Sequence, residues 1–411
     1  MNKLKTKKSL SFPTWPYLAT PIIVTLYFNV AAADPFNTPK FMLLLIFTTY
    51  MLSYVLLQAR NLTFNLKDSQ VRIYLLISIF LLFLLIATFN TDQRFVGLFG
   101  ESQRRNGFLT YLMLSILLIY ATLVANIISA KKLINVVILV ALIQGLYGLL
   151  QSMGRDFVNW NNPYNPVITT MGNPNYASAV LAVFAVLSSL LLFVKPLSII
   201  MKLILVVTTF VSMYVVISSD SRQGLILFAI SILFYTTIYI SRQYKKYRPW
   251  AILTFFTFIS FGILAMLQIG PLTQFIYKQS VSVRGYYWRA GISMFLDKPF
   301  FGVGVDRYGS YFKEYRELEY PLKYGFDITS TDAHNNFIQM FATGGVFVGL
   351  LYMFITLYVF YAGMKLIFDK KNENFQLCLI IFSARLGLLA QSVVSINNLG
   401  TAVWSWTIGL S

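Results

Sequence analysis

The sequence SVRGYYWRAGISMFLDKPFFGVGVDRYG, residues 282–309, and the sequence STDAHNNFIQMFATGGVFVGLL, residues 330–351, belong to the longest polar interruption in an otherwise apolar chain. This interruption runs from residue 269 to residue 337 and contains His334, the only histidine among 411 residues. An imidazole can take up and return a proton near neutral pH. A hydrophobic run resumes a few residues later, so we expect His334 to lie at the edge of a membrane span.

Composition is typical of an integral membrane protein. Hydrophobic residues make up 57% of the chain and charged residues only 12%, which is far from the composition of soluble domains. The net charge of +18 would indicate a nucleic-acid partner in a soluble chain. Here its distribution indicates membrane topology instead, and we expect no nucleic-acid partner. The single cysteine, Cys378, excludes an internal disulfide and a cysteine metal cluster.

Apolar runs of near membrane-spanning length predict an all-α polytopic membrane protein with about twelve transmembrane helices. They cover residues 14–33, 39–58, 72–89, 107–128, 133–150, 174–194, 199–218, 222–240, 249–268, 345–364 and 376–396, and a last run begins at Gly400. Ala31-Ala32-Ala33 leaves signal-peptidase cleavage after the first run as an alternative. The last run is too short to cross a bilayer, so we expect truncation inside a twelfth helix, and residues 1–411 as one membrane domain.

The distribution of lysine and arginine predicts the orientation of these helices. Alternate connections, including the N-terminus, hold 18 of these residues, whereas the short connections on the opposite side hold 6. Short cytoplasmic loops collect positive charge. We therefore expect a large loop, residues 269–337, between helices 9 and 10 that faces away from the cytoplasm.

Two further external segments are rich in polar groups. The sequence GLFGESQRRNGF, residues 97–108, holds two adjacent arginines between glycines, and residues 151–177 contain many Asn, Pro and Gly residues that predict a structured loop. The side chains in these segments that we consider possible substrate-binding residues are Arg104, Arg105, Asn173 and Asn175.

Arg222 and Arg385 are positive charges at or within apolar runs. Arginine at membrane depth costs about 2.5–3.5 kcal/mol on insertion scales, so it normally faces a polar cavity or a partner. For Arg222, a structural ion pair with Asp220 and contact with lipid headgroups are alternatives to a functional role. For Arg385, structural pairing is favoured over function.

Residues 281–295 predict a helix that lies in the membrane interface, because apolar and aromatic residues recur at helical spacing around Arg284 and Trp288. One interpretation is a surface helix anchored by Trp288. In the other, Arg284 and Arg289 point toward a lipid-linked phosphate, whose oxygens a guanidinium can bind in a fork. The tyrosines that follow are candidates either for stacking on sugar rings or for an interfacial belt, namely Tyr308, Tyr311, Tyr315, Tyr320 and Tyr324.

His334 follows Thr331 and Asp332, two good N-cap residues, so we expect it in the first turn of the next helix. The helix dipole at that place favours a neutral imidazole that can act as a base, and Asp332 works in the opposite direction. The alternative is an ordinary polar surface histidine.

Several short motifs, in this order, resemble the O-antigen ligase and O-antigen polymerase superfamily. They are Arg284 and Trp288 in R-x-x-x-W, the turn Pro299 to Gly304, A-H-N-N-F-I-Q at residues 333–339, Gly344-Gly345, S-x-S-R-Q-G at residues 219–224, and G-N-P-N at residues 172–175. The resemblance covers residues 97 to 396.

This resemblance implies a GT-C-like enzyme of the bacterial inner membrane that transfers an undecaprenyl-diphosphate-linked glycan with inversion on the extracytoplasmic face. It implies that His334 is the general base and that Arg222 and Arg284 hold the diphosphate, and we add Arg289 as a candidate. No metal or other cofactor is expected. Expected partners are membrane lipids and an acceptor glycan, lipid or protein. Further residues of the motifs that we consider possible substrate-binding residues are Trp288, Asp332 and Asn335.

Other functions remain open at this point. Within the enzyme class, the resemblance fits both a ligase and a polysaccharide polymerase. A polytopic transporter or a lipid-linked oligosaccharide flippase would also have about twelve helices, although it is expected to place polar groups near the midplane and to show repeated halves. Peptidoglycan glycosyltransferases of the shape and division family are a third possibility, for which a catalytic acid is expected in the large loop.

Overall fold

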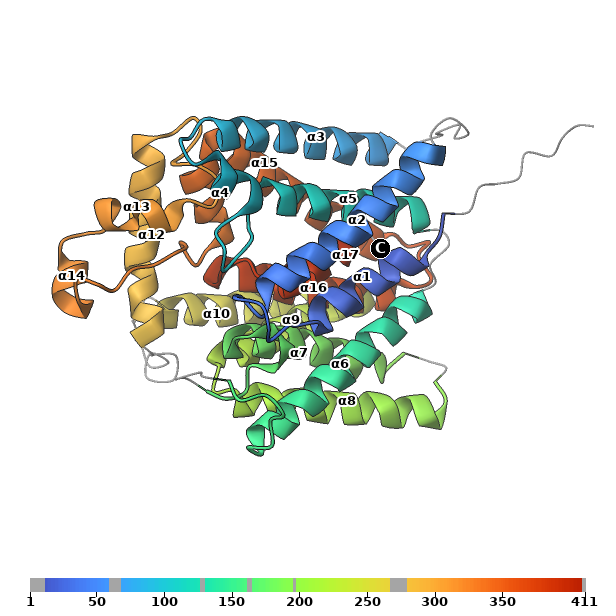
Figure 1. Ribbon diagram of the computed structural model, residues 1–411. Helices are drawn as coiled ribbons and strands as arrows, with labels where there is room; N and C mark the ends of the chain where they lie inside the picture. Colours follow the sequence, from blue (N-terminus) through green and yellow to red (C-terminus); the bar gives the residue numbers. More distant parts are fainter. Residues whose placement is uncertain are drawn as a thin grey trace, which may run out of the picture.

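The computed structural model describes residues 12–58, 68–125, 130–160, 165–194, 197–266 and 279–408. Within these residues every regular element is a helix, and no β-strand occurs. Most of the long helices form one bundle, and a smaller helical group lies at one end of it (Figure 1). The predicted all-α architecture is confirmed for this part of the chain.

The helices follow the predicted apolar runs. In chain order they are α1 Trp15–Leu26, α2 Asn37–Gln58, α3 Asp68–Phe89, α4 Arg94–Phe99, α5 Phe108–Val124, α6 Ala130–Ser152, η2 Thr169–Met171, α7 Pro174–Leu191, α8 Ile199–Ser218, α9 Arg222–Gln243, η3 Lys245–Tyr247, α10 Arg248–Met266, α12 Gln279–Asp297, α13 Tyr308–Tyr315, α14 Glu319–Tyr324, α15 Asn336–Phe368, α16 Phe375–Val394 and α17 Leu399–Thr407. In the segment expected as a structured loop, residues 151–177, the described residues between α6 and α7 contain one short helix, η2.

Nine helices of the described residues are long and apolar enough to cross a membrane, namely α2, α3, α6, α7, α8, α9, α10, α15 and α16. Two more, α1 and α5, are apolar but shorter. The predicted first run, residues 14–33, yields a helix of only 12 residues. It ends early because the chain turns back, with Asn29 N–H donating to the Pro35 carbonyl (2.9 Å), and Asp34 then accepts from backbone N–H groups at the start of α2.

Helix α7 lies at the centre of the bundle. From Ala177 to Leu191 only Ser189 is not buried, and α7 packs against α8, α9 and α16. A helix that is apolar all round must be covered on every side. Its first turn lies beside the start of α9, because the Asn175 side chain accepts from the Ser221 hydroxyl (2.8 Å).

Lys40, in the first turn of α2, is also inside the bundle. It is fully buried in α2, and its Nζ donates to the carbonyls of Thr25 (3.0 Å) and Thr170 (2.7 Å). These bonds join α2 to the end of α1 and to η2, so the buried ammonium group connects three elements.

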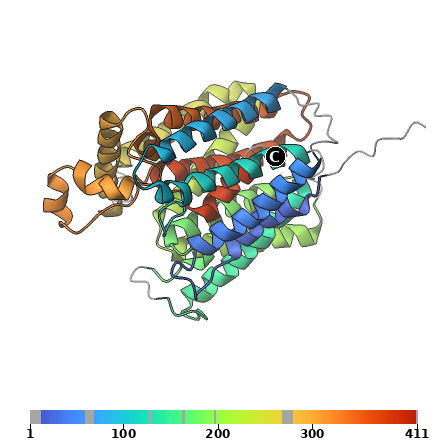
Figure 2. The same cartoon turned by 45° about the horizontal axis from the view of Figure 1, so that its top comes forward.

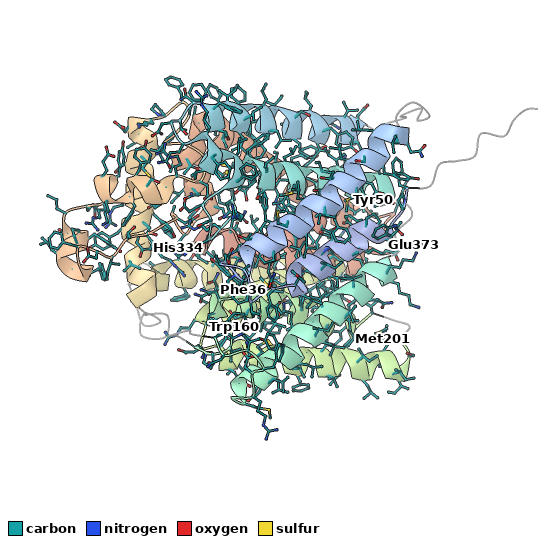
Figure 3. The ribbon with its side chains drawn as sticks, in the orientation of Figure 1. Phe36, Tyr50, Trp160, Met201, His334 and Glu373 are labelled. Atoms are coloured by element: carbon teal, nitrogen blue, oxygen red, sulfur yellow. The ribbon has the colours of Figure 1, made fainter. Side chains whose placement is uncertain are left out.

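The loop between α10 and α15 forms its own small helical group. Helix α12 crosses the end of the bundle instead of running along it, and α13 and α14 lie outside α12 (Figures 1 and 2). Tyr287, Met294 and Phe312 belong to a separate apolar cluster that holds this group together. The helix predicted at residues 281–295 is confirmed, and its packed face carries Tyr287 and Met294. The loop lies at the opposite end of the bundle from Glu373, which follows α15 (Figure 3).

Helix α15 is broken at Gly345, where φ is 76°. A Cβ atom at this position would lie 2.2 Å from the Phe300 carbonyl oxygen, so only glycine fits. The next residue, Val346, donates its N–H to the Pro299 carbonyl (2.7 Å). The turn after α12 therefore replaces part of the helical hydrogen bonding and fixes the outer segment of α15.

Candidate active site

His334 lies two residues before the first residue of α15. The prediction that Thr331 or Asp332 caps this helix is wrong, because Asn335 is the N-cap and its Oδ1 accepts from the backbone N–H groups two and three residues later. His334 is therefore outside the helix, with a left-handed backbone (φ 52°). A residue with a side chain rarely adopts this conformation without support from its surroundings.

Asp332 provides that support. One of its carboxylate oxygens accepts the backbone N–H of His334 (2.6 Å), and the other lies 3.2 Å from Nη1 of Arg104. Both charged side chains are almost completely buried. Burial raises the pKa of the Asp332 carboxyl, and the Arg104 charge opposes this rise. The ion pair thus joins the segment before α5 to the backbone of the histidine.

The imidazole ring is held by a second contact. It stacks on the Tyr287 ring of α12, with 5.3 Å between centroids and 27° between planes. Tyr287 is itself fixed, because the Tyr308 hydroxyl donates to its carbonyl (2.7 Å). Burial lowers the pKa of His334 to about 3, with the charges of Arg284 and Arg104 acting in the same direction. The ring is therefore neutral at physiological pH. It faces the junction between α12 and the bundle (Figure 3).

Two arginines next to His334 have unused hydrogen-bonding capacity. Burial lowers the pKa of the half-buried Arg284 on α12, and its Nε has no hydrogen-bond partner among the described residues. The same holds for Nη2 of Arg104 and for the indole N–H of Trp288. Buried donors without partners are uncommon in proteins. They indicate a place where a negatively charged or hydrogen-bond-accepting ligand can bind.

The starts of α7 and α9 are joined beside this site. Asn173 caps α7 by accepting the backbone N–H of Asn175 (2.8 Å), and the Asn175 side chain accepts from the Ser221 hydroxyl (2.8 Å). Ser221 is the N-cap residue of α9, whose first residue is Arg222. Asn173 and Asn175 therefore position the two helix starts, and Arg222 lies where the N-terminus of a helix favours anions.

Tyr176 was not predicted from the sequence. It follows Asn175 directly, and the charges of Arg104, Asp332 and Arg284 all act on its hydroxyl. The phenol thus lies between the α7–α9 junction and the arginines next to His334. A tyrosine near the outer end of a span is so common in membrane proteins that the sequence gives no separate signal for it.

Two predicted site arginines are engaged elsewhere. Arg105 donates from Nε to the Thr38 hydroxyl (3.1 Å). Arg289 lies on an exposed face of α12, where it forms a bidentate ion pair with Glu317 (2.6 and 2.8 Å). Neither is among the charges that act on His334. The five-residue spacing between Arg284 and Arg289 places them on different faces of the helix.

The tyrosines of the loop divide into two groups. Tyr308 and Tyr320 are completely buried in the cluster around Tyr287, so neither the sugar-stacking nor the membrane-belt interpretation applies to them. Tyr311 and Tyr315 are only partly buried. Their phenol rings remain at the surface of the loop.

A small polar pocket adjoins Asp332. Its walls include Asp306, Asn336, Gln339 and Asn397. Asp306 accepts the backbone N–H groups of two residues that flank Arg104, and burial raises its pKa to about 6. Within the described residues no group of three or more His, Cys, Asp and Glu side chains is arranged to hold a metal ion.

Arg385 lies deeper, in the middle of α16. Its Nη1 donates to the Ser405 carbonyl (3.4 Å), and it lines a polar cavity together with Asn336, Gln391 and Asn397. The contact with Ser405 is in keeping with the structural role that the sequence favoured.

Residues 207–353 match the family described as O-antigen ligase. This match includes Arg222, Arg284 and His334, whereas Arg104 precedes it. A search of curated proteins found no significant match. The protein is thus a multi-pass membrane protein that contains, over residues 207–353, the domain of the O-antigen ligase family, which is a family of enzymes.

Proposed function

We propose that this protein is an inverting glycosyltransferase that moves a glycan from undecaprenyl diphosphate to an acceptor hydroxyl, either as a ligase or as a polysaccharide polymerase. In this proposal His334 is the general base, and Arg222 and Arg284 hold the donor diphosphate. We also infer that the reaction takes place on the extracytoplasmic face, because the short connections at the other end of the bundle collect lysine and arginine.

The observation that carries the proposal is a neutral, partly buried histidine next to two guanidinium groups with unused donors. The acceptor oxygen attacks the anomeric carbon from the face opposite the diphosphate, and His334 takes its proton. The anomeric C–O bond breaks, and its electron pair stays on the diphosphate. Positive side chains fixed before the reaction stabilise this charge where it develops. Inversion at the anomeric carbon follows.

The low pKa of His334 in the free protein fits a mechanism in which the donor binds before His334 acts as the base. In the free protein, burial and the neighbouring positive charges keep the ring unprotonated. A bound diphosphate neutralises Arg284, and nearby negative charge favours the imidazolium. Donor binding should therefore raise the proton affinity of His334 when a base is needed. Arg289 is left out of this site because of its pair with Glu317.

The test is glycan transfer by the purified full-length protein, supplied with undecaprenyl-diphosphate oligosaccharide from its host, with products separated by size. His334→Ala should lower the rate about 10²–10⁴-fold as expected for loss of a general base, and Arg284→Gln about 10²–10³-fold for loss of a charge-stabilising donor. Arg289→Gln is the matched control on the same helix and should keep most of the activity.

The products also separate the remaining alternatives. A ladder of lengths would identify a polymerase, and one block on a new acceptor would identify a ligase. Full transfer by His334→Ala would remove this residue from the mechanism. Movement of intact glycolipid between leaflets without any transfer would favour the flippase interpretation.

A further inference from the structure

A second groove lies on the outer side of the loop, apart from His334. Its walls come from the turn between α3 and α4, with Asn90, Thr91 and Asp92, and from the turn after α12, with Asp297 and Lys298. Arg307 and Tyr311 form the remaining polar wall. The mechanism proposed above uses none of these residues.

Arg307 is the central side chain of this groove. It is 5% exposed and pairs with the largely exposed carboxylate of Asp92, but its Nε has no hydrogen-bond partner among the described residues. The Thr91 hydroxyl is buried and unpartnered in the same way. Leaving a buried donor without a partner is energetically unfavourable. The groove therefore offers hydrogen bonds that a ligand can complete.

An aromatic ring adjoins these donors. Cζ of Arg307 lies 5.0 Å from the centroid of the Tyr311 ring, and Nζ of Lys298 lies 4.8 Å from it. Both contacts are within the range of cation–π attraction. The ring is thus held in place at the groove wall, and its partly buried phenol remains next to the cations.

The charges in the groove decide which class of ligand fits. Two carboxylates, Asp92 and Asp297, stand beside two cations, Lys298 and Arg307, so their formal charges cancel. A phosphate would need the cations without the carboxylates. A neutral ligand with many hydroxyl groups needs donors and acceptors close together, because each hydroxyl both donates and accepts. An amide, a hydroxyl and an aromatic ring complete such a surface.

The groove shares a rigid wall with the active site. The backbone N–H groups of Val303 and Gly304 donate to the carbonyls of Ala342 (2.9 Å) and Thr343 (3.1 Å) in the outer segment of α15. Asp306, one residue before Arg307, faces the polar pocket beside Asp332. One turn therefore has the active-site pocket on one side and the groove on the other.

We propose that this groove binds the sugar chain of the acceptor. The proposal rests on the function proposed above, since an enzyme that transfers a glycan to a glycan acceptor must hold this acceptor at a fixed position relative to its general base. The acceptor hydroxyl reacts near His334, and sugars farther along the acceptor chain occupy the groove around Arg307 and Tyr311.

The first experiment is saturation-transfer NMR on the full-length protein in nanodiscs. The probes are oligosaccharides of the host's surface polysaccharide, glycerophosphoethanolamine as a lipid headgroup, and inorganic phosphate. We expect signals from the oligosaccharide that are lost in both Lys298→Ala and Tyr311→Leu. Lys313→Ala is the matched control, because Lys313 is an exposed lysine of α13 outside the groove, and it should bind like the wild type.

Oligosaccharide binding that survives both groove substitutions would overturn the proposal, as would groove-dependent binding of the headgroup or of phosphate in its place. In transfer assays the groove variants should raise the acceptor KM about tenfold while kcat and the donor KM stay unchanged, which is the pattern for lost ground-state binding. His334→Ala should still bind the oligosaccharide. These experiments therefore distinguish an incorrect assignment of His334 as the base from an incorrect assignment of the groove as the acceptor-binding site.

Discussion

The buried ion pair between Arg104 and Asp332 gives the most direct test of how the histidine is positioned. We consider Arg104→Gln, Asp332→Asn and the double variant. The amide introduced by Asp332→Asn would keep an oxygen for the backbone N–H of His334, so this single change removes mainly the charge. Each single variant leaves the opposite charge buried without its partner, whereas the double variant leaves two neutral side chains in the same space.

The magnitude follows from the geometry. Two unit charges 3.2 Å apart attract by about 5 kcal/mol at an effective dielectric constant of 20. Breaking a buried pair by removing one partner typically costs about 3–5 kcal/mol, because the remaining charge is uncompensated. Each single variant should therefore lose about 3–5 kcal/mol of unfolding free energy. The double variant should lose about 3 kcal/mol less than the sum of the two.

The assay is denaturant unfolding of the four proteins in detergent, combined with glycan transfer at a temperature where all remain folded. Asp332→Asn should also lower kcat, because the segment that carries His334 loses its ion pair with Arg104. A strictly additive cycle would refute the reasoning, since it would mean that the 3.2 Å contact contributes no coupling. Unchanged stability of Asp332→Asn would refute it as well.

Three further predictions concern other charged residues. The unfolded chain protonates His334 near pH 6.5, while the folded protein keeps it neutral down to about 3, so this residue destabilises the fold as pH falls below 6.5. Between pH 7.5 and 4.5 the wild type should lose about 2.7 kcal/mol more unfolding free energy than His334→Gln, measured by denaturant unfolding at both pH values; equal losses would contradict the assigned burial. Lys40→Met should lower the unfolding free energy by about 1–3 kcal/mol, because the buried Thr170 carbonyl loses the Lys40 ammonium group, whereas the Thr25 carbonyl still accepts from the Thr170 hydroxyl; a wild-type unfolding curve would contradict this role. Arg289→Ala should change stability by less than about 1 kcal/mol, because its pair with Glu317 is half exposed, and a larger loss would show that α14 depends on this contact.

Much of the architecture was predictable from the sequence, because a lipid environment imposes long apolar helices. The same logic predicted α12, whose apolar side chains recur at helical spacing. It also identified Arg284 and His334 as a pair, since both stand in the one large polar loop. The structure brings their charges within interaction range, whereas the role of each residue in catalysis remains a prediction.

The remaining features of the candidate site depend on contacts between distant parts of the sequence, which no local sequence pattern predicts. Arg104 and Asp332 are far apart in the sequence, and their pairing turns the Asp332 side chain away from the helix-capping role that its residue type suggested. Asn335 takes that role instead. In the same way, nothing in the spacing of the loop tyrosines distinguishes the buried Tyr308 from the partly buried Tyr311. The capping residue and the burial of these tyrosines depend on tertiary packing, so they can be identified only in the folded structure.

The hydrogen bonds at Val303 and Gly304 have a consequence for how proteins with this loop can diversify. The outer part of the loop follows Val303 and Gly304, which are hydrogen-bonded to Ala342 and Thr343. It ends at Ala333, whose N–H donates to the Gln339 side chain (3.0 Å) in the same short segment of α15. Both ends of the outer part of the loop are thus hydrogen-bonded to the outer segment of α15. Segments between such fixed points can be exchanged or lengthened with little effect on the remaining fold. Exchanging residues 307–331 between related proteins, which leaves Asp306 and Asp332 in place, should change acceptor choice while the membrane bundle is retained; this part of the loop would then act as an exchangeable determinant of specificity.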